Sequence, residues 1–136
     1  MIFIWVFNFM INIKISYGEL FDKISILEIK KTKLTNSDDI KNVTFELNLL
    51  TDALNKSHIH NNDIDQLFNE LKKVNLQLWE IEDKIREKEK YSIFDDEFIK
   101  LARSVYKTND KRSKIKKQIN INLKSEVFEI KSYQDY

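Results

Sequence analysis

Two segments of this chain carry side chains whose types and helical spacing could form a binding site. The first runs from residue 78 to 86 and the second from residue 98 to 112, and both place charged and aromatic residues beside an apolar stripe. Arginine guanidinium groups bind carboxylates and phosphates through paired hydrogen bonds. We therefore expect a pocket for a small anionic ligand, or for acidic side chains of a partner, lined by Trp79, Glu82, Asp83, Arg86, Arg103, Tyr106, Asn109 and Arg112.

The same residues have a structural explanation, which the sequence does not separate from the functional one. If the two segments form an antiparallel helical hairpin, Glu82 lies near Arg103 and Trp79 lies near Tyr106. Polar residues at such a seam fix the alignment of two helices at some cost in stability. The polar layer at residues 108, 109 and 112 is thus either a site or a device that sets the register.

Composition predicts an all-α fold. The 136 residues contain one glycine and no proline, so the chain has few means of making tight turns or of interrupting helices. Its 42% hydrophobic and 33% charged residues suit long helices with one solvated face. We expect a four-helix antiparallel bundle or long helical hairpins with coiled-coil-like seams, formed by a single domain over residues 10–136.

Local patterns predict the bounds of the four helices. Ser16 and Glu19 have capping-box spacing, so the first helix should begin at residue 17 and end near residue 34. The second should follow the polar cluster at 35–39, and the third should begin after residue 62 or 63 with a three-four alternation of apolar residues. The acidic run at 95–97 favours a fourth helix that extends to about residue 123.

Both ends of the chain carry apolar residues. The first eleven residues are too few to span a membrane and lack the pattern of a signal peptide. We interpret residues 1–9 as an N-terminal extension that precedes an initiator at Met10, and an apolar strand or interfacial anchor is the alternative. Residues 11–16 alternate apolar and polar side chains, and residues 126–133 do so in part. A minor two-stranded pairing of the two ends is therefore an open alternative.

Other partners and cofactors find little support. The formal net charge is +1, and the basic run at 111–117 also complements the C-terminal half of a helix, so we expect no nucleic-acid partner. Cysteine is absent, which suits a cytoplasmic protein, and His58 and His60 lack nearby carboxylates. We expect no metal or other cofactor and no catalytic residue.

Four blocks together resemble an uncharacterised bacterial family of short, mostly helical proteins, a domain of unknown function. The blocks are residues 18–30, 78–86, 101–112 and 129–133, and the resemblance covers about Met10 to Tyr136. The resemblance implies no catalytic residue or cofactor, and it points to surface-glycan biosynthesis. We expect a non-enzymatic helical interaction or assembly module that binds a protein partner or a second copy. The alternative is a small-ligand site, or a metal-dependent nucleotide-hydrolysing enzyme, at the polar layer.

Overall fold

The computed structural model describes residues 9–59 and 62–136, and it contains four helices. They are α1 (Tyr17–Lys33), α2 (Ser37–Lys56), α3 (Asn62–Lys90) and α4 (Asp96–Asn122). The predicted all-α class is confirmed. The starts of α1, α3 and α4 and the ends of α1 and α4 lie within about two residues of the predicted bounds, whereas α2 begins at Ser37, inside the polar cluster that it is predicted to follow. Most of the predicted extension at residues 1–9, and His60 of the loop, lie outside the described residues.

Capping side chains explain where the helices start. Ser16 Oγ accepts a hydrogen bond from the Glu19 backbone N–H at 3.1 Å, Asn36 caps α2, and Asp95 caps α4. Only half of the predicted capping box forms, because the Glu19 carboxylate pairs with Lys116 of α4 and does not turn back to its own helix. A tertiary contact has taken the place of the local one.

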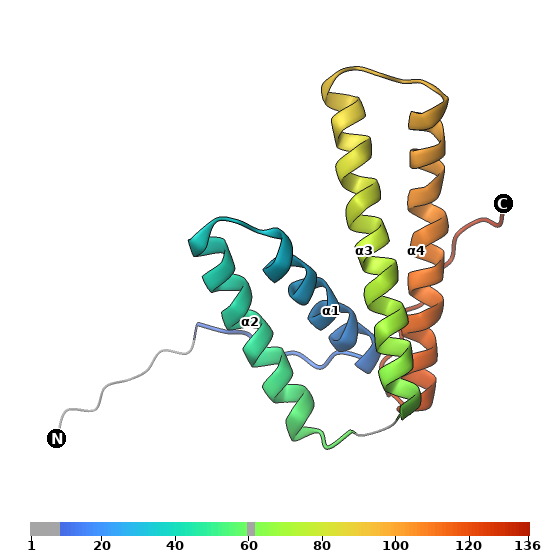
Figure 1. Cartoon of the computed structure of the whole chain (residues 1–136). Helices are drawn as coiled ribbons and strands as arrows, with labels where there is room; N and C mark the ends of the chain where they lie inside the picture. The colour runs from blue at the N-terminus through green and yellow to red at the C-terminus, as the bar shows by residue number, and fades with distance from the viewer. Residues whose placement is uncertain (1–8, 60–61) are drawn as a thin grey trace.

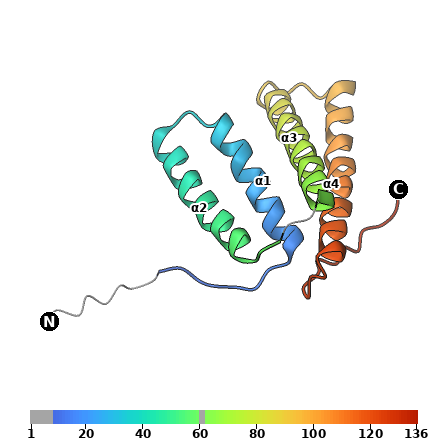
Figure 2. The same cartoon turned by 60° about the horizontal axis from the view of Figure 1, so that its bottom comes forward.

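Helix α1 is the central element of the fold (Figure 1). It packs against α2 on one side and against the α3–α4 hairpin on the other, whereas α2 contacts no other helix (Figure 2). Phe21 of α1, Ile64 and Leu71 of α3, and Ile119 of α4 form the buried core. The long hairpin is therefore α3–α4, and α2 is an outer helix with no fully buried residue.

The predicted pairing of the two chain ends is wrong for the described residues, which contain no strand. Side chains hold the C-terminal segment in place of a backbone ladder. Ser125 Oγ accepts from the Tyr17 backbone N–H at 3.4 Å, and the Tyr136 hydroxyl donates to Asp110 at 2.6 Å. The segment consequently runs back beside α4 without a regular structure.

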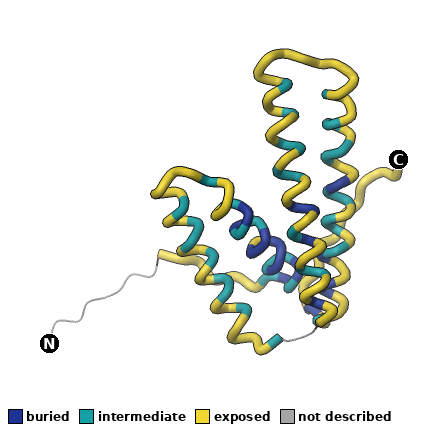
Figure 3. The backbone as a smooth tube through the Cα atoms, in the orientation of Figure 1, coloured by how far each residue is buried: buried dark blue, intermediate teal, exposed yellow. Residues whose placement is uncertain are grey.

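Burial in the hairpin stops halfway along its length. The last buried residue of α3 is Asn75, and the first buried residue of α4 is Thr108. Beyond them the hairpin projects past α1 and α2, and its residues are half-buried or exposed (Figure 3). We call residues 76–107 the protruding hairpin. Its apolar seam, which includes Leu78, Ile81 and Val105, is half-buried.

Shortening the protruding hairpin should leave the fold intact. We expect a variant in which a short glycine-asparagine linker replaces residues 84–101 to unfold cooperatively, with a melting temperature lower by about 5 °C or less. The physical reason is that this segment contains no buried residue. Circular dichroism melting tests the prediction, and a loss of cooperative unfolding would contradict it.

Candidate functional site

A groove lies between α1 and the base of the protruding hairpin, with a volume of about 360 Å³. Its floor is apolar and comes from α1 and α3, and its rim is charged. The lining residues are Ile26, Ile29, Asn75, Leu78, Trp79, Glu82, Asp83, Arg86 and Arg112. An apolar floor with a few polar groups at the edge is the usual character of a binding groove.

Five of the eight predicted site residues line this groove, namely Trp79, Glu82, Asp83, Arg86 and Arg112. Asn109 lies beside it, since its Oδ1 is 3.5 Å from Arg112 Nη1. Arg103 and Tyr106 do not line the groove: both are exposed on α4, and the Tyr106 ring stacks edge-on against Tyr136 at 5.0 Å. The structure thus divides the predicted set between a groove and an exposed face.

Glu82 and Arg103, which the antiparallel register would bring close together, form no ion pair with each other. Glu82 accepts a hydrogen bond from Arg86 Nε, one turn along the same helix, at 3.2 Å. Arg112 binds Asp22 of α1, so its charge is also neutralised. Among its described lining residues the groove therefore holds no unpaired arginine for the anionic ligand that the sequence predicts, and its rim also carries the exposed Asp83.

A cluster of buried polar residues underlies the groove, and its centre is Asp22 of α1. The Asp22 carboxylate is 1% exposed and accepts hydrogen bonds from Asn75 Nδ2 at 2.8 Å, from Arg112 Nε at 3.0 Å and from Arg112 Nη2. Asn75 Nδ2 also lies 2.7 Å from Ser25 Oγ. Arg112 of the polar layer thus pairs with α1 rather than with α3.

Opposing effects set the pKa of Asp22. Burial by itself raises the pKa, because it disfavours the charged carboxylate. The hydrogen bonds from Arg112 and Asn75 and the positive charges of Arg112 and Lys116 outweigh burial, so the pKa of Asp22 lies below its ordinary value. The same hydrogen bond, with the nearby negative charges, raises the pKa of Arg112. The pair is ionised at neutral pH.

Lys116 extends this cluster to the C-terminal segment. Its ammonium lies 2.8 Å from Glu19, 3.0 Å from Glu129 and 3.7 Å from Asp22. Burial lowers the pKa of Lys116, but the hydrogen bonds to Glu19 and Glu129 raise it. The hydrogen bonds and the nearby negative charges outweigh burial, so the pKa of Lys116 lies above its ordinary value. No described residue has a buried side-chain nitrogen or oxygen without a hydrogen-bond partner. The cluster is fully satisfied and joins α1, α3, α4 and the C-terminal segment.

Gly18 allows α1 and α4 to approach closely. A Cβ atom at this position would lie 2.6 Å from the Lys116 carbonyl oxygen and 3.0 Å from Asn120 Oδ1. The Gly18 backbone N–H donates to that same Asn120 oxygen at 2.6 Å. The single glycine of the chain therefore permits the helix contact that brings Lys116 to Glu19.

Sequence reasoning missed most of the buried cluster. Asp22, Ser25 and Asn75 are not among the predicted site residues, and Lys116 enters only as part of the basic run at 111–117. One signal was present: Asp22 lies between the apolar Phe21 and Ile24, and Lys116 follows Ile115, so each charge borders an apolar stripe. A charged residue beside such a stripe predicts a buried partner, but the sequence does not say which one.

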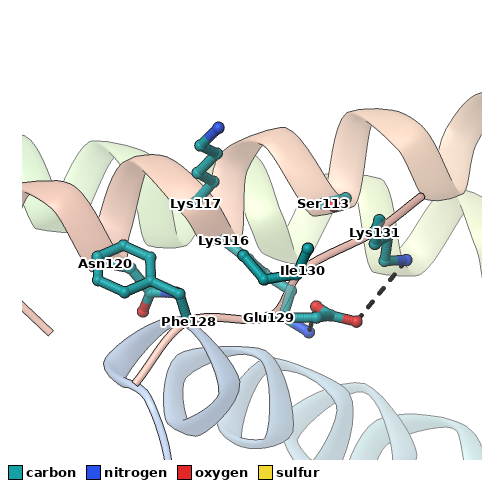
Figure 4. Close-up of a pocket in the computed structure, with 8 residues that line it drawn as sticks. All are labelled: Ser113, Lys116, Lys117, Asn120, Phe128, Glu129, Ile130 and Lys131. Atoms are coloured by element: carbon teal, nitrogen blue, oxygen red, sulfur yellow. Dashed lines mark hydrogen bonds and ion pairs between the residues drawn. The ribbon is translucent and has the colours of Figure 1, made fainter. Parts of the chain in front are cut away.

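A second hollow of about 280 Å³ lies where the C-terminal segment crosses α4 (Figure 4). Lys116, Lys117 and Asn120 line it from α4, and Phe128 and Glu129 line it from the C-terminal segment. Glu129 is paired with Lys116, and the side chain of Lys117 points away from the other lining residues. The cations of this hollow are therefore neutralised or directed elsewhere.

The arrangement offers little to a metal ion. Among the described residues, no three His, Asp or Glu side chains gather closely enough to hold one. Glu19 and Asp22 have the three-residue spacing of carboxylates that can share a magnesium ion on one helix face, but they already bind Lys116 and Arg112. These cations occupy the oxygens that a metal would need.

Comparison with known proteins places the chain in a family. Neither a curated protein nor a solved structure matches it. The sequence model of a family of unknown function matches residues 11–136, which is most of the chain. The chain belongs to this family of unknown function, DUF6165.

Proposed function

We propose that this protein is a helical assembly module, and that a helix of its partner packs against the protruding hairpin and into the groove at its base. The observation that carries the proposal is the end of burial at Asn75 and Thr108, while apolar residues continue along both helices. Helices in water are stabilised mainly by packing of an apolar face. A two-helix projection with a half-buried seam is therefore incomplete without a further helix.

Exposed apolar side chains near the end of the hairpin support this proposal. Tyr91, Phe94 and Ile99 are each more than half exposed, and Ile93 is close to that level. Single exposed apolar residues are normal, but a group of them within a few residues is typical of interaction surfaces. Aromatic side chains in particular supply much of the binding energy at protein interfaces.

A small-molecule site in the groove is the second candidate, and the position of Trp79 favours it. The groove is about 360 Å³, which suits a ligand of moderate size. Its rim pairs Arg86 with Glu82 and carries Asp83, so an anion finds no unpaired cation there. The groove fits a neutral, largely apolar ligand better than the anion that the sequence predicts.

Cross-linking from a single position tests the assembly function. A photo-reactive amino acid in place of Ile99, which is 53% exposed, should form covalent adducts with a protein in the producing cell. Ile121 is the matched control, because it is the same residue type, lies on the same helix and is 56% exposed. We expect adducts from position 99 and none from position 121. Equal adducts from both, or none from position 99, would contradict the proposal.

Fluorescence of Trp79 tests the second candidate function, a small-molecule site in the groove. In a Trp5→Phe background Trp79 is the only tryptophan, so its emission reports on the groove. A neutral, largely apolar compound that changes this emission and raises the melting temperature would favour a ligand site of the kind that the groove fits, and a nucleotide or sugar nucleotide that does so would favour the anion instead. The predicted roles in surface-glycan biosynthesis and in the cytoplasm remain predictions. No helix among the described residues is long and apolar enough to cross a membrane.

A further inference from the structure

The two outer edges of the protruding hairpin carry opposite charges. On α3, Glu80, Asp83 and Glu87 are exposed, and we call them the acidic edge. On α4, exposed basic residues have the same spacing of three and then four residues. They are Lys100, Arg103 and Lys107, which we call the basic edge. Residues three and four apart lie on one side of a helix, so each set of three shares one side of its helix, and exposed Lys84 borders the acidic edge.

Neither edge is neutralised within the described part of the chain. The ion pairs of the protruding hairpin join Arg86 to Glu82, and Lys88 to Asp95 and Glu97. None of the six residues of the two edges takes part in an ion pair. Both edges are therefore available to an oppositely charged surface.

We propose that the partner of the assembly module is a second copy of this chain, whose basic edge binds the acidic edge of the first. This inference rests on the proposed function and names the partner. In an antiparallel alignment Glu80 lies against Lys107, Asp83 against Arg103, and Glu87 against Lys100. The charges and the spacing of the two edges match at all three positions.

Apolar contacts accompany these charges. Ile99 and Tyr106 flank Arg103 on α4 and are both exposed. Trp79 and the apolar floor of the groove lie beside the acidic edge on α3. A basic edge docked on the acidic edge brings Ile99 and Tyr106 of one copy close to the groove of the other. Apolar burial then supplies affinity, and the charges fix the alignment.

The overall charge also permits self-association. The formal net charge is only +1, so two copies do not repel each other as whole molecules. Because the contact joins two different surfaces of the same chain, each copy keeps one free edge after pairing. Such a contact continues into a ring or an open chain and does not stop at a two-fold dimer.

Charge reversal with complementation tests the inference. One triple variant, E80K/D83K/E87K, makes both edges basic, and another, K100E/R103E/K107E, makes both edges acidic. The new charges agree with the helix dipole, since lysines are added near the end of α3 and glutamates near the start of α4. Sedimentation velocity on the purified full chain, at low salt and rising concentration, measures association. The control K111E/K114E/K117E changes exposed lysines of α4 outside the protruding hairpin.

We expect the unaltered chain and the control to associate, each triple variant alone to associate at least about tenfold more weakly, and an equimolar mixture of the two variants to recover association. A mixture that stays monomeric, or a control that fails in the same way, overturns the inference. If the unaltered chain is monomeric throughout while position 99 cross-links to another protein, the inference fails and the proposed function stands. If position 99 gives no adduct, the proposed function fails as well.

Discussion

Replacing Asp22 by alanine is expected to lower the free energy of unfolding by about 3–5 kcal/mol. The substitution removes the carboxylate that binds Asn75 and the Nε and Nη2 nitrogens of Arg112, and it leaves the cations of Arg112 and Lys116 without this partner. A buried charge without its partner costs far more than the pair itself contributes. Urea unfolding at neutral pH measures the loss.

Two comparisons make the Asp22 prediction specific. Glu28→Ala removes the Glu28–Lys72 ion pair at 2.6 Å, whose side chains are both partly exposed, and should cost about 1 kcal/mol or less. The double variant D22A/R112A should lose less stability than the sum of the two single variants, because removing both partners leaves fewer unpaired charges. A loss of about 1 kcal/mol in D22A itself would show that the cluster does not stabilise the fold.

The pH dependence follows from the lowered pKa of Asp22. A carboxylate whose pKa is lower in the folded state than its ordinary 3.8 stabilises the fold above that value. The stabilisation is lost as the pH falls through the pKa of the folded state. The difference in unfolding free energy between the unaltered protein and Asp22→Asn should therefore be constant near neutral pH and shrink below about pH 4.

Replacing Gly18 by alanine is the second large change, and we expect it to cost about 1–3 kcal/mol. The added Cβ would lie 2.6 Å from the Lys116 carbonyl oxygen, and a backbone atom cannot move aside as a flexible side chain can. Helices α1 and α4 must separate, which also lengthens the hydrogen bond from Gly18 to Asn120. Alanine favours helices over glycine, so any stabilisation would contradict this prediction.

An exposed position on the same helix provides the control for Gly18. Lys23→Ala changes an exposed α1 residue and should alter stability by about 0.5 kcal/mol or less. Chemical unfolding of both variants under the same conditions makes the comparison. If steric contact with α4 is the cause, amide exchange should rise where Gly18 meets Asn120 and Lys116, and should stay unchanged at the far end of the hairpin.

The sequence by itself determined the helices. Their signals are local: capping residues such as Ser16 and Asp95 act within three residues, and apolar spacing acts within two turns. The scarcity of glycine and proline determined the fold class for the same reason. The sequence also located part of the groove, because Trp79, Glu82 and Arg86 lie on successive turns of one helix.

Only the tertiary structure decided which residues meet. Asp22 and Arg112 are 90 residues apart, and Glu19 and Lys116 are 97 apart, so no local pattern pairs them. Burial decided that Lys116 belongs to the core cluster and that Arg103 stays on an exposed edge. The packing of α1 against both helices of the hairpin is the physical reason, since it buries one half of the hairpin and leaves the other half without a neighbour.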